Sequence, residues 1–302
     1  MDSIEDYTID HLLAEQVGTA TIIGEIARGG MGIVLLAYQR TLKRRIAVKI
    51  LPKLLLDEAT RQRFQLEAEA AANLSHPNII PIYEVGETDE FLFFTMQLVQ
   101  GEALSDILQR TRKHFLPSRR TLPLMQTITI ISQILDALDY AHRQGVIHQD
   151  IKPGNILIER NTGRTFISDF GLAKVLRGEE IDSCIRGTPV YMAPEQIKGA
   201  DTDGRADIYS VGIMLLEMLV PQELMGSYDS TGDFLKAKME KGDALFSQRP
   251  SELNSLLHPE MDTIIRKATT YNPMQRYATC MEFRNAIDHY GHQYLNANGD
   301  RT

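Results

Sequence analysis

The stretch His148-Gln149-Asp150-Ile151-Lys152-Pro153-Gly154-Asn155 places a carboxylate, a lysine and a carboxamide at short fixed spacings. It follows a helix-like run and precedes the apolar letters Ile156-Leu157-Ile158. A carboxylate can accept a proton, a lysine can neutralise a moving phosphoryl group, and an amide oxygen can bind a metal ion. This loop therefore predicts phosphoryl-transfer chemistry, and the rest of the chain is interpreted around it.

Composition limits the class of protein. With 302 residues, 43% of them hydrophobic, the chain can bury a sizeable core in one or two compact units. A net charge of −8 gives no reason to expect a nucleic-acid partner. Cys184 and Cys280 are too few for a disulfide framework, the N-terminus is acidic, and no apolar run approaches the ~20 residues of a membrane helix. We expect a cytoplasmic chain without a membrane segment.

The period of the hydrophobic pattern changes along the chain. The N-terminal third predicts strands and one main helix over residues 57–74, which Asp57 can cap. Beyond residue 101 a period of 3.6 predicts helices. The expected strands cover residues 22–26, 33–37, 45–51, 79–85 and 91–98, with a short hairpin at 156–158 and 165–168; the expected helices cover 104–108, 124–142, 207–219, 233–241, 259–269 and 278–290. The pattern predicts an α+β fold whose two parts join near residues 97–101.

Two further motifs outside this loop belong to the same chemistry. Asp169-Phe170-Gly171 follows it, and Gly29-Gly30-Met31-Gly32 with Lys49 lies far upstream. Together these segments resemble the protein kinase family, most closely the eukaryotic-like (Hanks-type) serine/threonine kinases of bacteria, over residues 22–287. The resemblance implies a bilobal protein-kinase fold: an N-terminal arm (1–21), an N-lobe with a small antiparallel sheet and one main helix (22–99), a larger, mainly helical C-lobe (100–292) and a frayed tail (293–302).

The resemblance also implies an ATP site. Glycines let the backbone amides approach phosphate oxygens, and Lys49 would hold the α- and β-phosphates, oriented by Glu67 rather than by its neighbour Glu69. Taken alone, Lys49 could equally be a snorkelling surface lysine. Ala27 stands where the family usually has its first glycine, so we expect weaker nucleotide binding. The residues expected at the nucleotide are Ile26, Ala27, Gly29, Gly30, Gly32, Val34, Ala47, Lys49, Glu67, Gln97, Val99 and Leu157.

The family pattern assigns the chemistry to the loop and to the second motif. Asp150 would act as the base that accepts the substrate's hydroxyl proton, and Lys152 would neutralise the γ-phosphoryl group. Asn155 and Asp169 would hold Mg²⁺, with Mn²⁺ as an alternative. The lysine two places after Asp150 is the serine/threonine form, so the expected substrates are Ser and Thr hydroxyls of proteins.

Three structural roles follow from the same resemblance. Glu195, which ends the substrate-seating segment 187–195, is expected to pair with Arg276. Asp207 is expected to anchor the backbone of the catalytic loop, and His148 to pack inside the helical lobe.

Gln149 departs from the family pattern, which has an arginine before the catalytic aspartate. That arginine commonly receives a phosphate from the activation loop, and a neutral glutamine cannot. We therefore expect activity that does not depend on this switch. The hydroxyls available between the second motif and residue 193 are Ser183, Thr188 and Tyr191.

Two other functions compete with an active protein kinase. The first is a nucleotide-binding pseudokinase that serves as a scaffold, which typically lacks one or more of the six residues that bind the phosphates and the metal or carry the catalysis. All six are present here: Lys49, Glu67, Asp150, Lys152, Asn155 and Asp169. A small-molecule kinase generally lacks the segment 187–195. The sequence favours the active protein kinase and names neither its substrate, its upstream signal nor its oligomeric state.

Overall fold

The computed structural model describes residues 4, 7–29, 32–116, 119–170, 189–222, 224, 228, 230–246 and 248–294. Backbone contacts divide the chain into two compact units. The first holds the described residues up to Gln100 together with Asp169 and Phe170. The second holds Gly101–Ser168 and the described residues from Pro189 onward.

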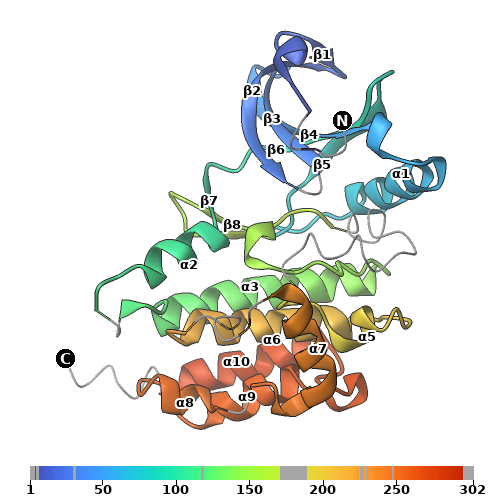
Figure 1. The fold of residues 1–302 in the computed structure, drawn as a ribbon. Coiled ribbons are helices and arrows are strands. Elements are labelled where there is room, and N and C mark those ends of the chain that lie inside the picture. Colours follow the sequence, from blue (N-terminus) through green and yellow to red (C-terminus); the bar gives the residue numbers. More distant parts are fainter. Residues whose placement is uncertain are drawn as a thin grey trace. The chain divides into compact units, whose positions relative to one another are not determined.

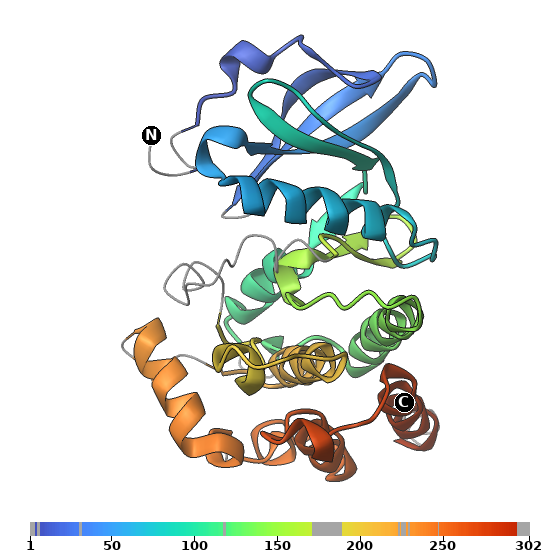
Figure 2. The same cartoon turned by 90° about the vertical axis from the view of Figure 1, so that its right-hand side faces the viewer.

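The first unit is a six-stranded antiparallel sheet with one main helix (Figure 1). The strand order is β1-β2-β3-β4-β6-β5. Helix α1 (Glu58–Ala72) packs beside β5 (Figure 2). The strands are β1 (Gln16–Val17), β2 (Ala20–Gly29), β3 (Gly32–Gln39), β4 (Arg44–Pro52), β5 (Ile82–Glu87) and β6 (Phe91–Gln97), with short 3₁₀ turns at Asp10–Leu12 and Lys53–Leu55.

The expected elements of this unit are confirmed. β4 is buried from Ile46 to Pro52, as its run of apolar letters predicts. Asp57 caps α1, because its side chain accepts a hydrogen bond from the Thr60 amide at 2.7 Å. The turn after Glu87 joins β5 and β6 into an antiparallel pair, and β5 begins at Ile82 instead of the expected residue 79.

The N-terminal segment differs from the expected arm. Tyr7, Leu12 and Val17 are buried in the core of the first unit. Arg28 of β2 fixes the segment, because its Nη1 donates to the carbonyls of Ile4 and Tyr7 at 2.8 and 2.6 Å. From Tyr7 onward these residues are therefore part of the sheet's own packing, and they supply its edge strand β1.

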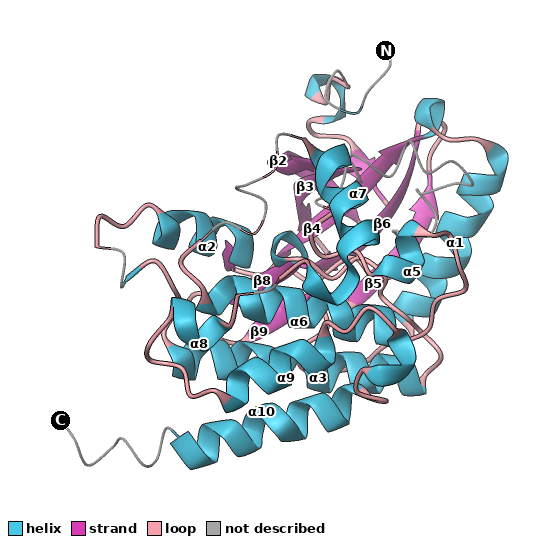
Figure 3. Ribbon diagram, turned by 60° about the horizontal axis from the view of Figure 1, so that its bottom comes forward, coloured by secondary structure: helices cyan, strands magenta, loops and turns pink. Residues whose placement is uncertain are grey.

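The second unit is mainly helical, with a small three-stranded sheet β7-β8-β9 (Figure 3). Helix α6 is buried from Ala206 to Leu219 and packs against α3 and α9; α10 also packs against α3 and α9. Its elements are β7 (Gly101–Ala103), α2 (Leu104–Arg112), α3 (Leu124–Arg143), β8 (Ile156–Glu159), β9 (Thr165–Ile167), α5 (Pro194–Ile197), α6 (Arg205–Leu219), α7 (Thr231–Lys241), α8 (Pro250–Leu253), α9 (Glu260–Ala268) and α10 (Cys280–Tyr294), with 3₁₀ turns at Pro153–Asn155, Gly242–Ala244 and Pro273–Gln275.

Several features of this unit were not expected, among them the short helices α5 and α8. Helix α2 continues to Arg112, beyond the predicted end at residue 108. β7 was not predicted, and it pairs with β8 through Gly101 and its two successors. Within the described ranges, no helix is both long and apolar enough to cross a membrane.

Candidate active site

The catalytic loop brings its three predicted residues into contact. The Lys152 Nζ atom lies 2.7 Å from Asp150 Oδ2. The Asn155 Nδ2 atom donates to the Asp150 carbonyl at 2.8 Å and to its Oδ2 at 2.9 Å. A single 3₁₀ turn, Pro153–Asn155, folds the loop back so that the amide reaches the carboxylate. A carboxylate, a cation and an amide thus form one cluster.

Asp207 holds this loop from the buried helix α6. Its carboxylate accepts hydrogen bonds from the backbone amides of His148 (2.9 Å) and Gln149 (2.7 Å), and its Oδ2 lies 2.8 Å from His142 Nε2. Complete burial alone would raise the pKa of Asp207, but the contacts with His142 and His148 outweigh it, so the pKa is lowered. The predicted anchoring role of Asp207 is confirmed.

The two residues before the proposed base are part of the same scaffold. His148 is fully buried, and its Nε2 lies 2.8 Å from the Ser168 carbonyl oxygen, which confirms the expected packing role. Gln149 has a positive φ of 63°, and its Nε2 donates to Thr202 Oγ1 at 2.9 Å. Its carbonyl accepts from the Gln196 side chain at 2.9 Å. The sequence did not predict these structural bonds of Gln149.

Lys49 lies inside the first unit. It is 3% exposed, and its Nζ lies 2.6 Å from Asp169 Oδ1. Asp169 adopts a positive φ of 61°, a conformation that non-glycine residues rarely take and that is associated with functional sites. The burial rules out the surface-lysine alternative. The pairing of Lys49 with Glu67, which lies on α1, stays a prediction.

The glycine-rich hairpin is built as the sequence predicts, as far as it is described. β2 pairs with β3 so that Ala27 faces Val34 and Gly29 faces Gly32. Gly32 has a φ of 128°, and a Cβ there would lie 2.7 Å from the Ile50 carbonyl oxygen, so only glycine fits. Gly30 lies outside the described residues.

The remaining nucleotide candidates divide between the two units. On the central strands, Val34 pairs with Lys49, and Ala47 pairs with Met96, one residue before Gln97. Leu157 is on β8 of the second unit, where it pairs with Phe166 of β9. Also in the first unit are Ile26, exposed on β2, and Val99, half-buried beyond β6.

Glu195 and Arg276 form the expected ion pair. The two guanidinium nitrogens Nη1 and Nη2 lie 2.7 and 2.8 Å from the two carboxylate oxygens. Arg276 also donates from Nε to the Thr270 carbonyl at 2.7 Å and is 4% exposed. A buried bidentate pair of this kind fixes the end of the segment that follows Pro189. Gly187, Thr188, Ser183 and Gly171, also named above, lie outside the described residues.

Lys238 is a functional candidate that sequence reasoning missed. It is 1% exposed, on α7, and its Nζ donates to the Val190 carbonyl at 2.8 Å and to the Met192 carbonyl. Burial, and then the nearby Arg276, hold its pKa well below the usual lysine range. The signal was available, because Lys238 follows Phe234 by four residues and so shares its buried helical face.

The protein kinase domain family matches residues 20–290. The chain is 34% identical to the serine/threonine-protein kinase pkn3 of Myxococcus xanthus, over 92% of this chain and 50% of that protein, and 35% identical to PknJ of Mycobacterium tuberculosis, over 86% and 43%. The kinase domain of Mycobacterium tuberculosis PknI superimposes with a TM-score of 0.73 at 25% identity, covering 93% of this chain and 98% of that domain.

The chain spans between about a third and a half of the length of the curated relatives it matches. The family match nevertheless covers most of the chain, and the solved kinase domain has the same fold over nearly its whole length. The fold class expected from the sequence is therefore confirmed. This chain belongs to the protein kinase domain family.

Proposed function

We propose that this chain is an ATP- and Mg²⁺-dependent protein serine/threonine kinase. The observation that carries the proposal is the cluster of Asp150, Lys152 and Asn155 on a loop held by Asp207. Its relatives are named serine/threonine-protein kinases, and the lysine at position 152 is the form typical of that class.

The proposed reaction transfers the γ-phosphoryl group to a Ser or Thr hydroxyl. The hydroxyl oxygen forms a bond to the γ-phosphorus, the bond from that phosphorus to the β–γ bridging oxygen breaks, and ADP leaves. Asp150 orients the hydroxyl and accepts its proton late in the transfer. Lys152, now paired with Asp150, supplies positive charge beside the same oxygen and can stabilise the charge of the transferred group.

The donor atoms of the site fit a hard divalent cation. The Nδ2 end of Asn155 is committed to Asp150, which leaves its Oδ1 as the acceptor end of the amide. Asp169 adds a carboxylate, and Mg²⁺ prefers such oxygen ligands together with phosphate oxygens. We propose Asn155 and Asp169 as the metal-holding residues, with Mn²⁺ as the alternative ion. The bound metal would neutralise charge on the phosphates.

The proposed nucleotide residues rest on the buried lysine of β4. Lys49 is buried and paired with the Asp169 carboxylate, as buried charged groups in proteins generally are. Lys49 would also bind the α- and β-phosphates, with Glu67 orienting it. The backbone between Ala27 and Val34 would cover the phosphates, and the strand residues beside Lys49 would contact the base.

The test is phosphate transfer from labelled ATP, to the protein itself and to a generic basic protein. Asp150→Asn keeps the size and the hydrogen-bond acceptor but removes the base, so transfer should fall by about 10²–10⁴-fold. Asp89→Asn, an exposed substitution in the β5–β6 turn, is the matched control and should match wild type. If wild type binds ATP but transfers nothing with either Mg²⁺ or Mn²⁺, the chain is a nucleotide-binding scaffold instead.

We further propose that activity does not require a phosphate bound next to the catalytic aspartate. Gln149 is neutral, and its amide is already bonded to Thr202. Ser183→Ala should therefore retain wild-type transfer to a protein substrate within about twofold, because no arginine at position 149 awaits a phosphoserine. A loss of tenfold or more in the alanine variant, restored by Ser183→Asp, would show that the loop is switched by phosphate after all.

A further inference from the structure

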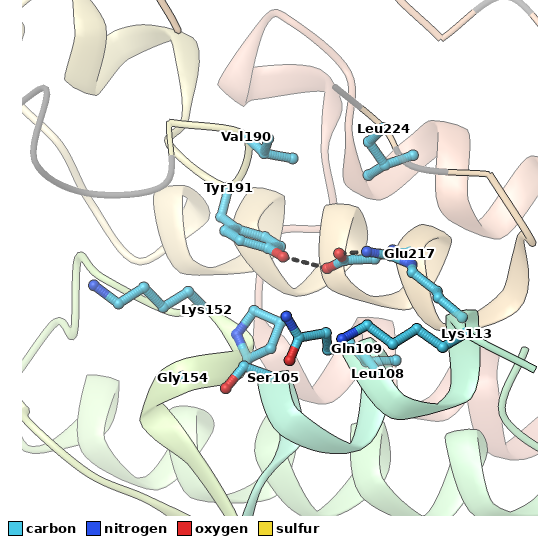
Figure 4. Close-up of a pocket in the computed structure, with 12 residues that line it drawn as sticks. Ser105, Leu108, Gln109, Lys113, Lys152, Gly154, Val190, Tyr191, Glu217 and Leu224 are labelled. Atoms are coloured by element: carbon cyan, nitrogen blue, oxygen red, sulfur yellow. Dashed lines mark hydrogen bonds and ion pairs between the residues drawn. The ribbon is translucent and has the colours of Figure 1, made fainter. Parts of the chain in front are cut away.

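A pocket of about 550 Å³ opens beside the catalytic loop within the second unit (Figure 4). Lys152 and Gly154 of the loop line one side of it. Residues of α2, the segment after Pro189 and α6 line the rest. Because Lys152 also contacts Asp150, a peptide whose hydroxyl reaches Asp150 would place a neighbouring residue in this pocket.

The charges that line the pocket are mostly positive. Of the twelve lining residues that the structure describes, Arg112, Lys113 and Lys152 are cationic, and only Glu217 is anionic. Gly154 contributes no side chain, and the position where its Cβ would stand is open space. The lining therefore carries an excess of two positive charges, one of which is shared with Asp150 through Lys152.

The carboxylate of Glu217 already has two partners within the described part of the chain. Glu217 Oε1 lies 2.7 Å from Arg112 Nη2, and Glu217 Oε2 accepts a hydrogen bond from the Tyr191 hydroxyl (Figure 4). Burial, and then the neighbouring Glu217, raise the pKa of Tyr191 far above its usual range, so the hydroxyl stays a donor. Glu217 is 9% exposed. A basic substrate residue would have to displace Arg112 to reach it.

Arg112 and Lys113, by contrast, can still bind a further anion. The buried Nε atom of Arg112 makes no hydrogen bond with any described residue. Lys113 is exposed at the end of α2 and forms no ion pair within the described part of the chain. Because Arg112 lines the pocket and a guanidinium has five N–H donors, Arg112 can bind an anion brought by a ligand in addition to Glu217.

We propose that this pocket binds an anionic side chain of the protein substrate, close to the Ser or Thr that is phosphorylated. Arg112 and Lys113 are the specificity-determining residues, and the shared chemistry is a carboxylate or a phosphate. The inference rests on the proposed kinase function and adds the substrate class to it.

The test compares kcat/KM for serine peptides in which each position near the acceptor is in turn Asp, phosphoserine, Gln or Arg. At one position we expect kcat/KM for an anionic residue to exceed that for Gln by about tenfold, and Arg to be disfavoured. A charge pair in a partly buried pocket is worth about 1.4 kcal/mol, which corresponds to a factor of ten. Asp and phosphoserine separate the two anion sources. Preference for phosphoserine alone assigns the pocket to previously phosphorylated substrates; preference for both assigns it to acidic sequences.

Two variants locate the preference. Lys113→Glu changes an exposed side chain and should reduce the Asp-to-Gln ratio by about fivefold or more. Arg112→Gln releases Glu217 and should move the preference at that position toward Arg. Lys236→Glu, with the same charge change on the exposed face of α7, is the matched control and should leave both the ratio and the activity as in wild type.

The outcomes separate the two proposals. A wild type that phosphorylates no peptide and no protein overturns the kinase function, and the substrate class with it. A wild type that is active but shows no anionic preference overturns the substrate class alone. An anionic preference that survives both Lys113→Glu and Arg112→Gln overturns the assignment to this pocket.

Discussion

Asp207 shows how one buried carboxylate can organise a loop that lies 58 to 59 residues away in the sequence. Its carboxylate accepts hydrogen bonds from two backbone amides of the catalytic loop and contacts His142 of α3. A glutamate at this position would move the two oxygens, and an asparagine would replace one of them with a donor nitrogen, so neither could accept both amides in the same way. The catalytic cluster therefore depends on a residue that touches no substrate.

Asp207→Asn should destabilise the protein by about 3 kcal/mol at pH 7, since removing the charge leaves buried partners without a full complement of acceptors. The lowered pKa of Asp207 sets the sign of the pH dependence. An aspartate that is more acidic in the folded state stabilises it above the unfolded pKa of about 3.9, and the contribution is lost as the pH falls through the folded value. The gap between wild type and variant should therefore be constant from pH 7 to about pH 5 and shrink below about pH 4.

Urea unfolding followed by circular dichroism at several pH values measures this gap. The exposed Asp89→Asn variant controls for the loss of one negative charge. A gap that widens as the pH falls would mean that folding raises the pKa of Asp207 instead of lowering it.

Among the elements, those with a local signal were predictable. β4 and α6 are rich in apolar residues, and Asp57 marks the start of α1. The catalytic residues of the loop were equally predictable from local sequence, because Asp150, Lys152 and Asn155 lie within six consecutive residues. Their contacts follow from that spacing.

The elements that the sequence did not reveal depend on contacts between distant segments. β7 is only three residues long, and it exists because Gly101 lets its backbone approach β8: a Cβ there would lie 2.1 Å from the Ile158 carbonyl oxygen. Tyr7 is held against the sheet by Arg28, which lies 21 positions away in the sequence. The Lys49–Asp169 pair likewise joins residues that are 120 positions apart. Patterns of period 2 or 3.6 carry no information about such partners.

For the whole molecule, nucleotide binding should appear as added stability. A ligand that binds only the folded state stabilises it by about 2.7 kcal/mol at a concentration of 100 Kd. ATP with Mg²⁺ should therefore raise the melting temperature of the wild type by about 5 °C. Chelation of the metal should remove much of this shift, because Asn155 and Asp169 would then face the phosphates without the cation that neutralises them.

Two substitutions separate binding from chemistry in the same measurement. Lys49→Met removes the buried cation proposed to hold the phosphates. ATP and Mg²⁺ should therefore change the melting temperature of this variant little, even if the substitution itself shifts the melting temperature of the free protein. Asp150→Asn removes the base but no proposed nucleotide contact, so it should keep the wild-type shift while losing transfer. Equal shifts in wild type and Lys49→Met would place the nucleotide away from β4. A lost shift in Asp150→Asn would mean that Asp150, through its contacts with Lys152 and Asn155, contributes to nucleotide binding as well as to the chemistry.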